Sequence, residues 1–87
     1  MSQDTRNTVS FNLQKDNEEK VRSILRTIFQ ALEEKGYNPT NQMAGYMISG
    51  DPAYITSHKG ARNLVCELDR YEIMEVLLKN YLLHLSD

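Results

Sequence analysis

The chain has 87 residues, of which 40% are hydrophobic and 25% charged, and its formal net charge is -2. This length predicts one domain with a small core, for which a dimer interface is a common additional stabiliser. The acidic balance argues against strong nucleic-acid binding, and the single cysteine, Cys66, excludes an intrachain disulfide. Apolar runs are too short for a signal peptide or a membrane span, which predicts a cytoplasmic protein without membrane insertion.

Residues 1–15 are predicted to form a mobile regulatory tail ahead of a helical domain over residues 16–87. Residues 8–13, TVSFNL, alternate polar and apolar side chains. This alternation predicts a short extended segment. A lone strand needs a partner, which a second subunit would supply.

The first helix is predicted to begin at Asp16, because Asp16 and Glu19 have the spacing of a capping box. Apolar residues then recur at helical spacing as far as Leu32. Gly36 follows the last charged residues and is predicted to end the helix.

A second helix is predicted over residues 39–49, with Asn38 as its N-cap, Pro39 at its first position and Gly50 at its end. Its apolar side chains spread around much of the cylinder, so it needs burial on more than one side. Gly45 costs about 1 kcal/mol here unless a close neighbour needs the space, and a helix contact within a dimer is one reason to keep it. The residues predicted for a dimer interface are Met43, Tyr46, Met47 and Ile48.

The last third is predicted to contain a short turn at 52–55 and two further helices, at about 60–68 and 70–85. The apolar stripe slips in phase between them, and Asp69 with Glu72 again has capping-box spacing. The fold prediction is therefore a mainly α homodimer with about four helices per chain.

The sequence offers no catalytic group, metal site or cofactor motif, which predicts a protein that is not an enzyme. His58 and Cys66 lack the further ligands of a zinc site. A basic group, Lys59, Arg62 and Arg70, is either a solvated helix face or a docking site for an acidic partner or a phosphate. By composition alone, Thr5 and Thr8 are ordinary tail residues with accessible hydroxyls.

Three blocks of sequence nevertheless resemble the IreB/ReoM family of small regulatory phosphoproteins of Gram-positive bacteria. They are EKGYNPTNQMAGYMISGDPAYI at 34–55, HKGARN at 58–63 and ELDRYEIMEVLLKNYL at 67–82. The resemblance implies a non-enzymatic helical homodimer that is a substrate of a membrane Ser/Thr kinase with extracellular PASTA repeats, and a partner phosphatase reverses the modification. It also implies a role in cell-envelope and peptidoglycan homeostasis and in antibiotic resistance, in one branch together with a Clp protease.

The same resemblance implies that Thr8 is the phosphorylation site, that Thr5 is a possible second site, and that Arg62 and Arg70, with Lys59, contact a partner. Two alternatives stay open. One is a constitutive protein-binding adaptor whose tail is incidental, and the other is a nucleic-acid-binding protein acting through HKGAR. The sequence departs from the family pattern at three positions. Thr56 and Ser57 stand where the family usually has proline and arginine, and Cys66 stands where it usually has a basic residue. These departures weaken the case for the adaptor role more than the case for the phosphoswitch.

Overall fold

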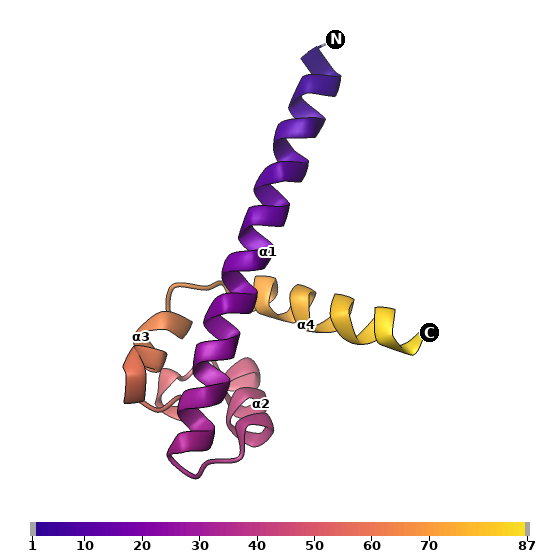
Figure 1. Cartoon of the computed structure of the whole chain (residues 1–87). Coiled ribbons are helices and arrows are strands. Elements are labelled where there is room, and N and C mark those ends of the chain that lie inside the picture. The colour runs from indigo at the N-terminus through magenta and orange to yellow at the C-terminus, as the bar shows by residue number, and fades with distance from the viewer. Residues whose placement is uncertain (1, 87) are drawn as a thin grey trace.

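The computed structural model describes the backbone of residues 2–86 and the side chains of residues 17–86. Within residues 2–86 it contains four α-helices, two short 3-10 helices and no strand (Figure 1). The elements are α1 (Ser2–Glu34), α2 (Pro39–Ser49), η1 (Pro52–Tyr54), η2 (His58–Gly60), α3 (Ala61–Val65) and α4 (Arg70–Leu85). The predicted mainly α fold is confirmed.

Helix α1 corrects the prediction for the N-terminal residues. Residues 8–13 are helical rather than extended, and the helix begins at Ser2 rather than at Asp16. A short alternation without a partner strand leaves backbone groups unpaired, whereas a helix satisfies them within itself. The side chains of Thr5 and Thr8 lie outside those that the structure describes, and the mobility of this segment stays a prediction.

Helix α2 has the predicted bounds because its caps are local. The Asn38 side chain accepts a hydrogen bond of 3.1 Å from the backbone N–H of Asn41, and Pro39 occupies the first turn. At the other end Gly50 adopts a left-handed conformation (φ 74°), and its N–H donates to the carbonyl of Tyr46.

The predicted break before the last helix is also confirmed. The Asp69 carboxylate accepts a 3.0 Å hydrogen bond from the N–H of Tyr71, and the N–H of Asp69 donates to the Glu72 carboxylate at 3.3 Å. This reciprocal arrangement is a capping box that starts α4. Helix α3 ends at Val65 and is therefore shorter than the predicted 60–68.

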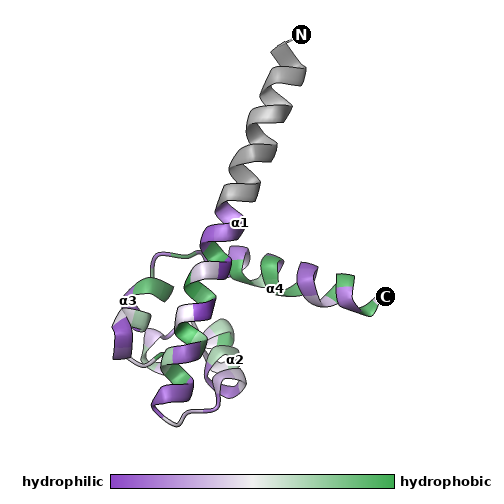
Figure 2. Cartoon of the chain, in the orientation of Figure 1, coloured by the Kyte–Doolittle hydropathy of each residue, from purple (hydrophilic) through white to green (hydrophobic). Residues whose placement is uncertain are grey.

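The core forms around the C-terminal half of α1, against which the other helices pack (Figure 2). Four fully buried side chains of α1 lie at helical spacing, namely Val21, Ile28, Ala31 and Leu32. The other core residues are Ile24, Tyr46, Ile55, Ala61, Val65, Leu68, Ile73 and Val76. Phe29, expected on the same apolar stripe, is 49% exposed.

Gly45 makes room for a neighbour within its own chain and not, as suggested above, for a second subunit. A Cβ built at Gly45 would lie 2.4 Å from Cε1 of the Tyr54 ring. The Gln42 side chain donates a 2.9 Å hydrogen bond to the backbone carbonyl of Tyr54, which ties η1 to α2 beside this contact. The aromatic ring thus packs directly on the helix backbone.

We expect Gly45→Ala to destabilise the fold by about 1 kcal/mol, because the added methyl group overpacks against Tyr54. In a Tyr54→Ala background the same substitution should instead be neutral or stabilising, since alanine is the better helix former. Urea unfolding of the two single variants and the double variant measures this reversal. A cost that is equal in both backgrounds would contradict it.

Candidate interaction surfaces

An apolar groove of about 520 Å³ lies between α2 and α4, with α1 contributing to its wall. Its lining residues are Leu25, Phe29, Pro39, Thr40, Met43, Ala44, Met47, Ile48, Met74 and Leu77. Apolar side chains gathered at the surface of a small domain are a common feature of interaction sites, which makes this groove a candidate.

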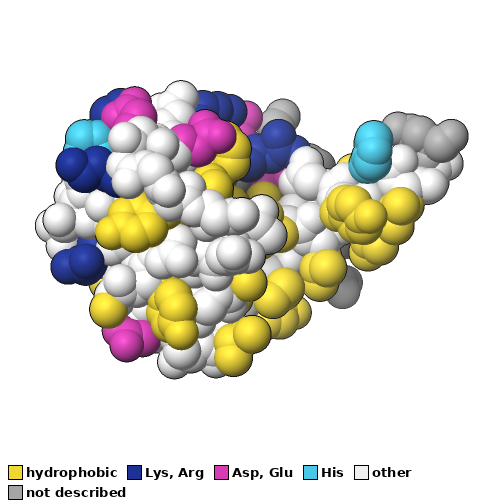
Figure 3. Space-filling view, turned by 90° about the horizontal axis from the view of Figure 1, so that it is seen from below, with side chains coloured by type: hydrophobic (Ala, Val, Ile, Leu, Met, Phe, Trp, Pro, Cys, Tyr) yellow, Lys and Arg dark blue, Asp and Glu magenta, His cyan; other side chains and the backbone are white. Residues whose placement is uncertain are grey.

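Helix α4 extends this apolar surface beyond the body of the domain. Met74 and Leu77 line the groove, and further along the helix an exposed row continues with Leu78, Tyr81, Leu82 and Leu85. These residues recur every three or four positions and therefore share one face of the helix. Figure 3 shows hydrophobic side chains passing from the body onto the arm that α4 forms.

The four residues predicted for a dimer interface do not share one environment. Met43 and Met47 are partly buried against the core and line the groove, and Ile48, also in its lining, is 85% exposed. Tyr46 is only 5% exposed and belongs to the core of its own chain. The exposed face of α4 was missed, because helical periodicity identifies a stripe but not whether anything covers it.

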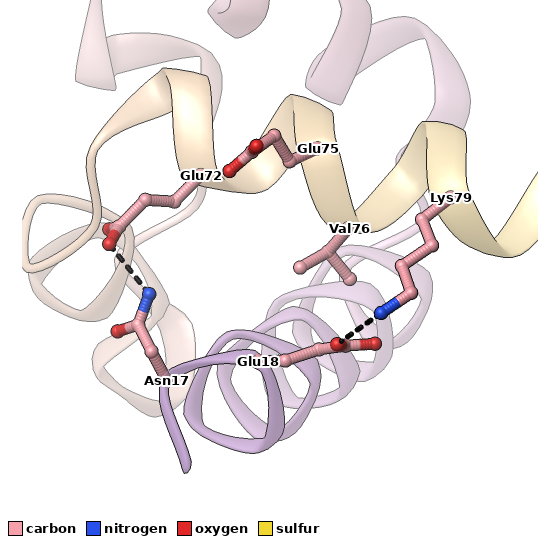
Figure 4. Close-up of a pocket in the computed structure, with 6 residues that line it drawn as sticks. All are labelled: Asn17, Glu18, Glu72, Glu75, Val76 and Lys79. Carbon is pink, nitrogen blue, oxygen red and sulfur yellow. Dashed lines mark hydrogen bonds and ion pairs between the residues drawn. The ribbon is translucent and has the colours of Figure 1, made fainter. Parts of the chain in front are cut away.

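Polar contacts fasten α4 to α1 around a second, smaller pocket of about 280 Å³ (Figure 4). Asn17 donates to the Glu72 carboxylate at 2.6 Å, and Lys79 donates to Glu18 at 3.1 Å. The hydrogen bond from Lys79 is the main reason that the pKa of Glu18 lies below its ordinary value. Arg22, which also pairs with Glu18, donates to the Asn80 side chain.

A comparison with protein-family models gives the relationship of this chain. The model of the IreB regulatory phosphoprotein matches residues 6–83. The chain belongs to the IreB family. The resemblance stated from the sequence is thereby confirmed, and a regulatory role follows from it. The matched segment contains Thr8, whereas Thr5 precedes it by one residue.

In this IreB family member, the residues predicted for partner binding each bond to another part of the chain. Lys59 pairs with Glu34 at 2.9 Å, Arg62 Nε donates to the carbonyl of Ile55 at 2.8 Å, and Arg70 Nη1 donates to a carbonyl of α2. All three side chains are still exposed. Since a guanidinium has five N–H donors, one backbone bond leaves either arginine able to bind a second ligand.

Lys59 occupies an unusual backbone conformation, with φ 57° in the left-handed region. Its ammonium group and the His58 ring both contact the Glu34 carboxylate, which ties η2 to the end of α1. The pKa of Glu34 is lowered mainly by the hydrogen bond from Lys59 and, to a smaller extent, by the hydrogen bond from His58. Thr56, at a position where the sequence departs from the family pattern, accepts a 3.2 Å hydrogen bond from the His58 N–H.

The matching family model describes a regulatory phosphoprotein. Between residues 2 and 86, no helix is both long and apolar enough to cross a membrane.

We expect Lys59→Gln to raise the pKa of Glu34 toward its ordinary value of 4.5. The substitution replaces the charged donor that lowers this pKa most with a neutral amide. In the native chain the pKa is lower when folded, so the contact stabilises the fold above pH 4.5 and is lost as the pH falls through the folded pKa. Carboxyl-carbon NMR titration measures this value. Lys35→Gln, a neighbouring exposed lysine, is the control. An unchanged titration of Glu34 in Lys59→Gln would show that the contact does not form.

Proposed function

We propose that this protein is a cytoplasmic, non-enzymatic phosphoswitch, phosphorylated by a membrane Ser/Thr kinase of the PASTA type and acting in peptidoglycan homeostasis through contacts with other proteins. The observation that carries the proposal is the family match, which spans nearly the whole chain and includes Thr8. The exposed apolar and basic surfaces support a protein that works by binding, because such surfaces are typical of contacts with other proteins. In this proposal a cognate phosphatase removes the phosphate.

Phosphorylation of Thr8 would be a large local change for this chain. A phosphate adds a charge of about -1.5 to -2 and three strong acceptor oxygens. The whole chain carries a formal net charge of only -2, so one modification would roughly double it. Partner surfaces rich in arginine would recognise such a group.

We expect the cytosolic domain of a PASTA-type kinase to place one phosphate on Thr8. Intact-mass and fragment-ion mass spectrometry should find it in the wild-type chain and in Thr5→Ala, and should find none in Thr8→Ala. A catalytically inactive kinase is the control for background. Equal phosphorylation of Thr8→Ala would contradict the assignment, and a second phosphate that disappears in Thr5→Ala would make Thr5 a second site.

The same material separates the switch from the constitutive adaptor. Pull-down of cellular partners with phosphorylated and unphosphorylated chain should differ if Thr8 acts as a switch. Identical binding, together with its loss in Arg62→Ala, would favour an adaptor that docks through Lys59, Arg62 and Arg70. Clp-dependent turnover of an enzyme of cell-wall synthesis belongs to this second candidate.

We further propose that the occupant of the apolar surface is a second copy of the chain. The groove and the exposed row of α4 are continuous through Met74 and Leu77, so one molecule offers both a hollow and a projecting apolar helix. Between Leu77 and Leu85 the helix carries only Lys79 and His84 as basic residues and no acidic residue. In a symmetric pair of chains, the exposed row of α4 of each chain would pack in the groove of the other chain, so that both grooves and both rows are buried. This assembly keeps Met43, Met47 and Ile48 from the predicted interface and replaces Tyr46 with the row on α4.

We expect Leu78→Glu to weaken the dimer by at least tenfold, because it places a charge within the apolar row. Leu83→Glu is a matched control. Leu83 is as exposed as the row, at 59%, but it lies seven residues after the buried Val76 and thus on another side of α4. Sedimentation velocity across micromolar concentrations gives both dissociation constants. Equal effects of the two substitutions would exclude this face of α4 as the interface.

A further inference from the structure

Arg70 connects the two helices that form the walls of the apolar groove. It is the first residue of α4, and its Nη1 donates a 3.0 Å hydrogen bond to the carbonyl of Met47 in α2. Met47 itself lines the groove, as do Met74 and Leu77 of α4. The bond therefore joins the two helices whose side chains form walls of the groove.

The guanidinium of Arg70 packs against Gly50. A Cβ at Gly50 would lie 2.8 Å from Cζ and 2.9 Å from Nη2 of Arg70, so the guanidinium rests directly against the glycine backbone. Gly50 suits the left-handed φ of 74°, and its lack of a side chain leaves room for this close approach. The planar guanidinium is held by contact as well as by its hydrogen bond.

The electrostatics of the two helix ends favour the same arrangement. Met47 is among the last four residues of α2, whose carbonyls have no partner within the helix and which carry the negative end of the helix dipole. A cation is stabilising at that position. Asp69 and Glu72 cap the start of α4 beside Arg70, so the residue that reaches across is part of an ordered turn.

We propose that Arg70 is a positioning residue that sets the direction of α4 relative to α2, and with it the width of the apolar groove. Both helices pack on α1, and the bond from Arg70 to Met47 supplies a direct link between them. Loss of Arg70 then changes the shape of the groove even when the partner never touches the arginine. The proposal stands whether or not Thr8 is phosphorylated.

Residual dipolar couplings of backbone amides test this directly, because they report the relative orientation of helices independently of stability. In the full-length wild-type chain, the couplings of α2 and α4 should fit one common alignment. In Arg70→Gln, α1 and α2 should still share an alignment, whereas α4 should depart from it. Arg26→Gln, which removes an exposed arginine of α1, is the matched control and should behave as wild type.

Arg70→Lys provides a second test should Arg70→Gln unfold. Lysine keeps the charge but lacks the planar group that lies on Gly50, so α4 should again reorient. A role limited to contact with a partner predicts instead that every folded variant keeps the wild-type alignment of α2 and α4. That result in either Arg70→Gln or Arg70→Lys would overturn the positioning role.

Discussion

The buried stripe of α1, from Val21 to Leu32, is the surface on which the rest of the domain depends. Helices α2, α3 and α4 all pack against α1. A chain of this size has little apolar surface to bury, and one central helix lets each short element contribute to the same core. Polar contacts at the ends of these elements add to the packing, as Lys59 does at η2 and Arg70 does at the start of α4.

Helix ends could be predicted from the sequence because their signals are local. Asn38 with Pro39, and Asp69 with Glu72, each act within four residues, so their spacing alone identifies a helix start. The alternation at residues 8–13 is equally local but much weaker, since a strand depends on a partner that the sequence does not name. The helix found there pairs its backbone groups within itself and needs no such partner.

The candidate surfaces depend on contacts between distant residues, and these were less predictable. Gly45 correctly indicated a close neighbour, but Tyr54 of the same chain fills the space that was expected for a second subunit. The stripe on α4 had the right period, yet only the packing shows that Ile73 and Val76 are buried while Leu78 and its row are exposed. Likewise, the sequence marks Arg70 as basic but cannot show that it reaches a carbonyl 23 residues earlier.

Distance limits how a phosphate on Thr8 could reach these surfaces. Thr8 lies nine positions before Asn17, whose side chain hydrogen-bonds to Glu72 of α4, and this is about 14 Å along a helix. Exposed charges that far apart are largely screened, because the Debye length is about 8 Å at physiological ionic strength. The ion pair between Glu18 and Lys79 is exposed and weak. Even so, the screened charge of a phosphate on Thr8 would supply little energy to break it. A phosphate on Thr8 is therefore better placed to be recognised by a partner that binds the N-terminal part of α1 than to rearrange α4 through space.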